Sequence, residues 1–147
     1  MVIEASEDEI CAIGFPAELP LESPNELSEM AKEQFREYFD EKRKHFDFPM
    51  AQPGTDFQQK VWDELRKIDP GKPISYAALA KRMQNPLAIR AIASANGRNN
   101  LIIVVPCHRV IGSKGELVGF SAGLWRKKWL LEHEAKMTSI GQSTLAF

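Results

Sequence analysis

The run Leu101-Ile102-Ile103-Val104-Val105 is the feature of this 147-residue chain that most constrains its fold. The run is short, wholly apolar and rich in β-branched side chains, which is typical of a strand buried on both faces. Pro106 has no backbone N–H to give to a sheet, so we expect the strand to end there and to leave Cys107 at its exit. Most free cysteines are small core residues. Beside the imidazole of His108, however, this thiol can be held as a thiolate, the form that attacks electrophiles.

The N-terminal third of the chain predicts a small lobe and a linker. Residues 2–5 and 10–13 have the pattern of a β-hairpin, in which Cys11 is a buried strand residue. The stretch Ser23-Pro24-Asn25-Glu26 predicts a helix start whose first residue is the N-cap, and apolar side chains follow at helical spacing. Residues 49–54 contain two prolines and a glycine, which indicates a linker.

Further helices are predicted after the linker. Thr55-Asp56-Phe57-Gln58 has the form of a capping box that opens a helix. Ser75 can cap a short helix through Met83, and Asn85 can cap a second one that runs to about Asn96. Two short helices around a tight turn fit a helix-turn-helix, although ordinary helical hairpins are commoner.

A last helix is predicted from about Ser121 to Ala135. In this helix we expect Leu124, Trp129 and Leu131 to face the core. We expect Arg126-Lys127-Lys128 to face solvent or phosphate. The residues after it are rich in Ser, Thr and Gly, which is typical of a mobile tail.

Charge is divided unevenly along the chain. Residues 1–64 carry 16 acidic and 6 basic residues, whereas residues 65–147 carry 4 acidic and 13 basic ones, although the net charge of the whole is only −1. The basic part contains Cys107. Such an asymmetry favours a polyanionic partner for one part of the molecule, while simple solvation of helix faces would also account for it.

The cysteine content and the N-terminus exclude several classes of protein. Cys11 and Cys107 are the only cysteines and lie far apart, so the chain has no disulfide framework and suits a reducing compartment. The acidic start MVIEASEDE has no apolar segment behind it, which predicts neither a signal peptide nor a transmembrane span. We expect a cytoplasmic protein with no membrane partner. Cys11 and His45 are too few for a closed zinc site, so no metal is expected.

The segment PCHRVIGSKGELVGFSAGLWRKKWLLEHE, which starts at Pro106, resembles the signature region of the O6-alkylguanine-DNA alkyltransferases, or methylated-DNA-protein-cysteine methyltransferases. The resemblance extends back through GTDFQQKVWDELRKIDPGKPISYAALA and NPLAIRAIASANGRNN. It therefore covers about Gly54 to Glu134 and is weak before Gly54, where the N-terminal lobe is about half the length common in larger relatives. PCHRV is a highly specific pattern for this family.

The resemblance implies an α+β protein in which a small lobe of β-hairpin and helix precedes a mainly helical lobe with a winged-helix-like helix-turn-helix. The implied organisation is a shortened N-terminal lobe at 1–48, a linker at 49–54, a DNA-binding alkyltransferase domain at 55–136 and a tail at 137–147. The implied activity is DNA repair: a monomer without cofactor binds double-stranded DNA and moves the alkyl group irreversibly from O6-alkylguanine, with O4-alkylthymine as a second candidate, to its own cysteine.

Five residues match catalytic positions of the family. Cys107 matches the nucleophile, and His108 and Glu134 match the imidazole and carboxylate of a relay that reaches the thiol through a water. Tyr76 matches the phenol that bonds guanine N3 as the base departs, and Asn99 matches an asparagine that ties the recognition helix to the cysteine loop.

Other residues match positions that bind the DNA or the extruded base. Arg90 matches the arginine that fills the stack after the base has rotated out. The carbonyl of Val110 and the N–H of Ser121 match backbone groups that face the exocyclic amine and O6 of guanine. Small residues beside Arg90 suit close approach to the minor groove: Ala88, Ala91 and Ser94.

Two alternatives remain on the residues alone. A non-catalytic lesion-binding relative would lack the thiol, and Cys107 argues against it. A helix-turn-helix regulator would hold Cys107 as inert core or as a redox sensor, and would prefer an operator sequence over a lesion.

Overall fold

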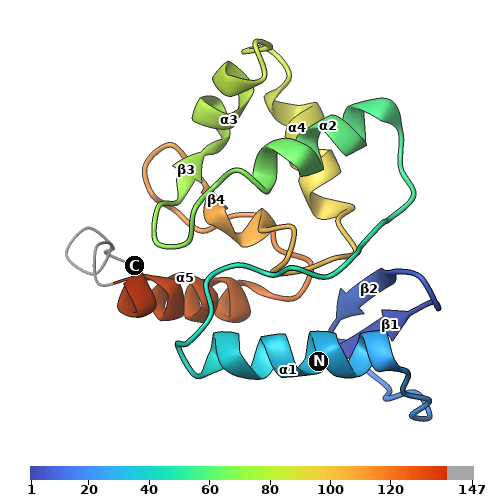
Figure 1. Ribbon diagram of the computed structural model, residues 1–147. Coiled ribbons are helices and arrows are strands. Elements are labelled where there is room, and N and C mark those ends of the chain that lie inside the picture. Colours follow the sequence, from blue (N-terminus) through green and yellow to red (C-terminus); the bar gives the residue numbers. More distant parts are fainter. Residues whose placement is uncertain (139–147) are drawn as a thin grey trace. The chain divides into compact units, whose positions relative to one another are not determined.

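The computed structural model describes residues 1–138, which form two compact units (Figure 1). The first comprises Met1–Pro53 and Asn100–Val104, and the second comprises Gly54–Asn99 and the chain from Val105 onward. The mixture of helices with two small two-stranded sheets confirms the α+β class. Within the described residues, no helix is both long enough and apolar enough to cross a membrane.

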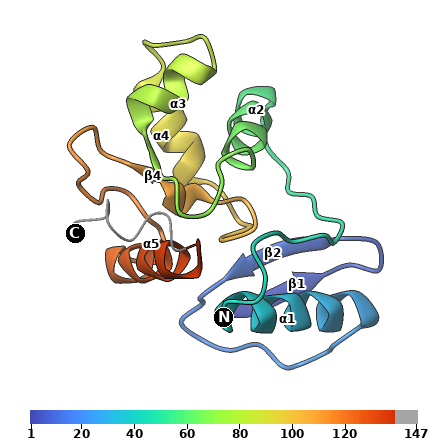
Figure 2. The same cartoon turned by 60° about the vertical axis from the view of Figure 1, so that its left-hand side comes forward.

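The first unit is a hairpin covered by a helix. Strands β1 (Val2–Ala5) and β2 (Ile10–Gly14) pair antiparallel, and α1 (Glu26–Phe39) packs against them (Figures 1 and 2). A register irregularity between Glu4 and Ala5 leaves Cys11 without a partner in the pairing. Cys11 is therefore the extra residue of a bulge, and it is exposed, not buried as predicted. The bulge shifts the alternation of side chains between the two faces, so that Ile10 and Ile13 both face the core.

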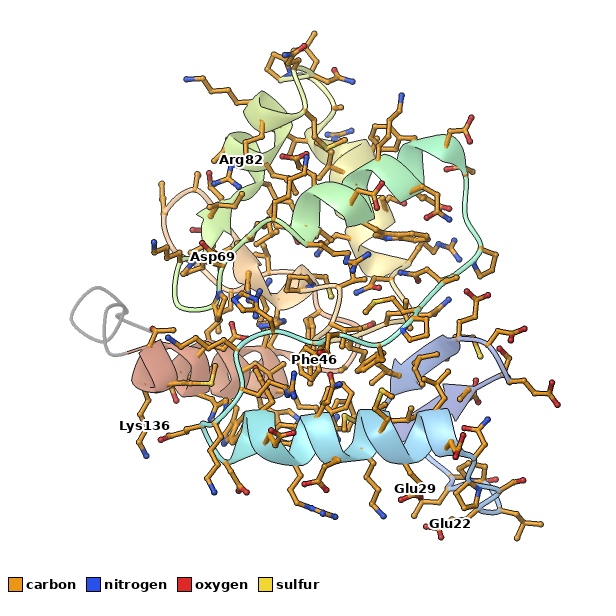
Figure 3. The ribbon with its side chains drawn as sticks, viewed as in Figure 1. Glu22, Glu29, Phe46, Asp69, Arg82 and Lys136 are labelled. Carbon is orange, nitrogen blue, oxygen red and sulfur yellow. The ribbon has the colours of Figure 1, made fainter. Side chains whose placement is uncertain are left out.

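Helix α1 is capped by its own sequence and is amphipathic. Its N-cap is Asn25, in a capping box with Ser28, and not Ser23 as expected. Glu29 lies on the outer side of the helix (Figure 3), whereas Phe35 and Tyr38 are buried. Their rings contact Phe46 with centroid separations of 4.7 and 5.5 Å, so an aromatic cluster forms the core of this small unit.

The apolar run at 101–105 is buried throughout, as predicted, but it is not a regular strand. Leu101 makes an isolated parallel bridge with Ile13, whose N–H donates to Asn100 O at 2.8 Å. Ile103 then has φ 76°, which breaks an extended chain. Residues 100–102 bond to β2, and residues 100–104 pack in the first unit, whereas the sequence had assigned them to a domain at 55–136.

The helical part of the second unit follows its caps closely. Thr55 and Gln58 form the predicted capping box of α2 (Asp56–Leu65), and Ser75 caps α3 (Tyr76–Arg82). Helix α4 spans Ile89–Gly97 and contacts both α2 and α3. It begins later than predicted, at the N-cap Ala88 and not at Asn85, because Ala88 N donates to Asn85 O and closes a separate turn that contains Pro86.

The rest of the second unit carries the cysteine segment. Strands β3 (Ile74–Ser75) and β4 (Val110–Ile111) pair parallel, and the short 3₁₀ helix η1 (Cys107–Arg109) leads into β4. Helix α5 spans Leu124–Thr138 and packs against η1. It begins after Gly123, whose φ of 98° suits glycine, and it includes the first two residues of the predicted tail. Residues 139–147 of that tail lie outside the described residues.

Candidate active site

Cys107 is fixed by a tight backbone turn. The Cys107 N–H donates to Val105 O at 2.8 Å, and Pro106 between them has φ −81° and ψ 65°, the geometry of an inverse γ-turn. The side chain of Asn99 donates to the same Val105 carbonyl at 2.8 Å. Arg109 N then donates to Pro106 O as η1 begins. These bonds hold the thiol in a buried position, with 3% of the residue exposed.

The two residues that follow the cysteine, His108 and Arg109, form a buried ion-pair network with Glu134. Glu134 on α5 accepts three hydrogen bonds at 2.8 Å, one from His108 Nε2 and two from the guanidinium of Arg109. Arg109 also donates to Ile68 O at 2.6 Å. Burial by itself would raise the pKa of Glu134, but His108 and Arg109 outweigh it and hold that pKa well below the usual carboxyl range. Glu134 is therefore a permanent carboxylate at neutral pH.

The network sets the protonation of His108. Burial lowers the pKa of His108 despite the attraction of Glu134, so the imidazole is neutral at pH 7. With Nε2–H donating to the carboxylate, Nδ1 is the acceptor nitrogen. Nδ1 is buried and has no hydrogen-bond partner among residues 1–138. Buried polar atoms are commonly satisfied by a water where the protein offers no partner.

The thiol itself is not held as a thiolate in the free protein. Burial raises the pKa of Cys107, and a hydrogen bond from Asn99 and the charge of Lys127 offset only part of that effect. The expectation that the thiol beside His108 can be held as a thiolate is therefore not met in the free protein. The proton must leave as the reaction proceeds, toward a neutral imidazole.

Lys127, predicted to face solvent or phosphate, is instead a buried cation of this site. Its ammonium donates to Val110 O at 2.7 Å and to Val118 O at 2.6 Å. Burial lowers the pKa of Lys127 to about 8, so the group is still charged at neutral pH. Its charge favours the ionised form of Cys107.

Tyr76 is the first residue of α3 and is linked to the cysteine segment through Asn96. The Asn96 side chain donates to Tyr76 Oη at 3.2 Å and to Cys107 O at 3.3 Å. Burial and the neighbouring Cys107 raise the pKa of Tyr76, so the phenol keeps its hydrogen at neutral pH. The site thus offers a nucleophile, a proton acceptor and a hydrogen-bond donor within one unit.

The comparisons with known proteins bear on this arrangement. Residues 56–136 match the 6-O-methylguanine DNA methyltransferase, DNA binding domain. The chain belongs to this methyltransferase family.

Relatives and solved structures agree with this assignment. A Methanosarcina mazei methylated-DNA–protein-cysteine methyltransferase is 48% identical over 101 residues, which are 69% of this chain and 64% of that protein. The constitutive enzyme of Bacillus subtilis is 51% identical over 100 residues, 68% of this chain and 59% of its own. This chain thus spans less than two thirds of the length of these relatives. The crystal structure of Mycobacterium tuberculosis OGT in complex with DNA has a TM-score of 0.83 and 34% identity, covering 92% of this chain and 86% of that one.

The methyltransferase-family residues predicted for catalysis all lie in the second unit. Cys107, His108 and Glu134 are joined through η1 and α5, and Tyr76 is joined to Cys107 through Asn96. Asn99 bonds Val105 O, the carbonyl before the cysteine turn, as a connecting residue would.

The residues predicted to contact DNA or the extruded base differ in their exposure to solvent. Arg90, Ala91 and Ser94 are exposed on α4, and Ala88 is its half-buried N-cap. Ser121 is exposed in the turn before α5, so its role stays a prediction. The Val110 carbonyl already accepts Lys127, which leaves one lone pair for a ligand.

Three residues of the site escaped the sequence analysis: Asn96, Arg109 and Lys127. Their helical spacing carried a signal for two of them. Lys127 shares the face of Leu130, Leu131 and Glu134 on α5, and all four are buried. Asn96 follows Ile92 by one turn on the buried face of α4. A polar residue in register with core residues indicates a buried polar group, which needs hydrogen-bond partners.

Proposed function

We propose that this protein repairs alkylated DNA by moving the alkyl group of O6-alkylguanine to Cys107 Sγ, once per molecule. The observation that carries the proposal is the buried chain of groups from Arg109 through Glu134 to His108, whose Nδ1 has no partner among residues 1–138 and which directly follows the buried Cys107 in the chain. A buried ion pair is weak evidence for stability alone, so its presence beside a buried cysteine in the chain supports a chemical role. The names of the relatives support the substrate class.

The transfer begins with the proton of Cys107. A water bonded to His108 Nδ1 receives that proton as Sγ attacks the alkyl carbon, and Glu134 stabilises the imidazolium that forms. Lys127 stabilises the thiolate by its charge. The C–O6 bond breaks with its electron pair on guanine, and the base gains one proton in place of the one that the thiol lost. The step balances without an oxidant or a reductant, and the thioether has no route back to a thiol.

The leaving base needs its developing charge dispersed. We assign this task to Tyr76, whose raised pKa keeps a hydroxyl hydrogen available for guanine N3. The carbonyl of Val110 and the N–H of Ser121 are the proposed contacts to the exocyclic amine and to O6. Asn99 holds the cysteine turn in place through Val105.

The alkylated base must leave the duplex to reach a buried thiol. We propose that α4 enters the minor groove with Arg90 in the vacated stack and with Ala88, Ala91 and Ser94 against the backbone. The exposure of Arg90, Ala91 and Ser94 supports this, as does the surplus of basic residues in the second half of the chain. All groups of the proposed site lie in one unit of one chain, which favours a monomer. A thiol that must stay reduced suits the cytoplasm.

A titration tests this function against that of a helix-turn-helix regulator. Duplexes with a single O6-methylguanine are mixed with increasing amounts of the protein, and the remaining lesions are counted. We expect one lesion lost per protein molecule, with no further repair after the protein is consumed. A regulator would remove none and would bind an undamaged preferred sequence at least as tightly as the lesion.

A further inference from the structure

Asn96 connects the two reactive side chains of the proposed site. It lies on the buried face of α4, with 3% of the residue exposed. Its amide nitrogen donates to Tyr76 Oη at 3.2 Å and to the backbone carbonyl of Cys107 at 3.3 Å. An amide nitrogen carries two hydrogens, so one is available for each acceptor. Asn96 is the side chain that bonds both the phenol and the cysteine backbone.

The carbonyl of Cys107 fixes which way the amide faces. A carbonyl oxygen can only accept, so the nitrogen of Asn96 and not its oxygen must point toward it. The same nitrogen then faces Tyr76 Oη. The amide oxygen, Oδ1, points the other way, where it is buried and has no hydrogen-bond partner among residues 1–138. Leaving a buried acceptor unpaired is unfavourable. The two bonds that the amide nitrogen donates therefore determine the orientation of the Asn96 side chain.

The direction of the bond to Tyr76 determines what the phenol can do. Since Asn96 donates to Oη, the hydroxyl hydrogen of Tyr76 is not used in that bond and remains free to be donated elsewhere. If an acceptor replaced the Asn96 amide nitrogen, the Tyr76 hydroxyl would donate its hydrogen to that acceptor. Oη would then present only lone pairs to the departing base. Gly119 lies close to Tyr76 Oη: a Cβ added to this glycine would be 3.6 Å from the phenol oxygen. The phenol oxygen therefore faces a stretch of backbone that carries no side chain.

We propose that Asn96 is a positioning residue that keeps the hydroxyl of Tyr76 a hydrogen-bond donor toward the departing base and holds it in register with Cys107. This rests on the proposed function and adds a residue to it. Asn96 touches neither the alkyl group nor the base, and it acts through Tyr76. Because it belongs to α4, the helix proposed to enter the DNA also sets the orientation of the donor.

The test uses Asn96→Asp and Asn96→Ala in a Cys11→Ser background, in which Cys107 is the only cysteine. Aspartate has the shape of asparagine but only accepts when ionised, so it takes the hydrogen of Tyr76 and repels the Cys107 carbonyl. We expect methyl transfer from a lesion duplex to slow by about 10–100-fold in both variants. The rate at which iodoacetamide alkylates Cys107 should change less than about 3-fold, because its leaving group, iodide, needs no hydrogen-bond donor.

A second measurement separates positioning from folding. In a Tyr76→Phe background the hydroxyl is absent, so Asn96→Ala should slow methyl transfer no further. Additive losses in the double variant, or equal losses with iodoacetamide and with DNA, would overturn the proposal. Asn100→Asp, at an exposed asparagine of the first unit, is the matched control and should behave as the parent. If the parent protein itself transfers no methyl group, the proposed function fails. If the parent transfers and the Asn96 variants do so equally fast, this inference alone fails.

Discussion

Replacing Glu134 with alanine is expected to lower the free energy of unfolding by about 3–5 kcal/mol, because it leaves a buried Arg109 and a buried His108 without their common partner. The loss should appear as a lower midpoint in urea with an unchanged slope. Glu132→Ala is the matched control on the same helix. Glu132 is more than half exposed and reaches Lys128 only at 3.8 Å, so its removal should change stability by less than about 0.5 kcal/mol.

The same network predicts how stability depends on pH. The pKa of Glu134 is lowered in the folded chain, so its contribution is complete above the ordinary carboxyl value of 4.5 and is lost as pH falls below it. The pKa of His108 is also lowered, so the unfolded chain takes up a proton below 6.5 that the folded chain refuses. Both groups make the protein less stable in acid. In Glu134→Gln, the urea midpoint should fall less steeply as the pH is lowered below 4.5, because the carboxylate that is protonated there is absent. An unaltered acid limb in Glu134→Gln would show that the carboxylate is not ion-paired in solution.

Arg90→Ala is expected to slow repair of duplex lesions by about 10–100-fold while leaving reaction with the free base O6-methylguanine nearly unchanged. Extruding a base from a duplex costs a few kcal/mol of unstacking, and a side chain that fills the gap recovers part of it. The free base needs no extrusion. Matched single-turnover rates on the two substrates measure the difference.

Two controls make the Arg90 result specific. Arg66→Ala removes another exposed arginine of the same unit, beyond the end of α2, and should affect the duplex rate by less than about 3-fold. Arg90→Lys keeps the positive charge, so it should restore affinity for duplex DNA more than it restores the rate at which the alkylated base is extruded. Equal losses of Arg90→Ala on both substrates would assign Arg90 to the pocket or to folding instead.

Local chemistry explains which parts of the fold the sequence predicts well. Thr55 and Ser75 cap α2 and α3 as predicted, because a hydroxyl that accepts the third backbone N–H needs only neighbouring residues. The hairpin of the first unit and the burial of residues 101–105 follow in the same way from side-chain pattern. The catalytic candidates came from the resemblance, and the structure joins His108 to Glu134 directly after Cys107 in the chain.

The features that escaped prediction depend on contacts between distant parts of the chain. The positive φ of Ile103 and the pairing of residues 100–102 with β2 are set by tertiary packing, which overrides β-propensity. Lys127 stands in a basic triplet that looks solvated, and only the carbonyls of Val110 and Val118 make its burial tolerable. The raised pKa of Cys107 likewise follows from burial that no motif reveals.

The most direct test of the account is the site of alkyl transfer. The protein is incubated with an equimolar duplex that contains one O6-methylguanine, digested, and mapped by peptide mass, with Cys107→Ala as the control. The account predicts one added methyl group on the peptide that contains Cys107, none on the peptide that contains Cys11, and none on either peptide of the control protein. A methyl group on Cys11, or repair of the lesion by Cys107→Ala, would contradict it.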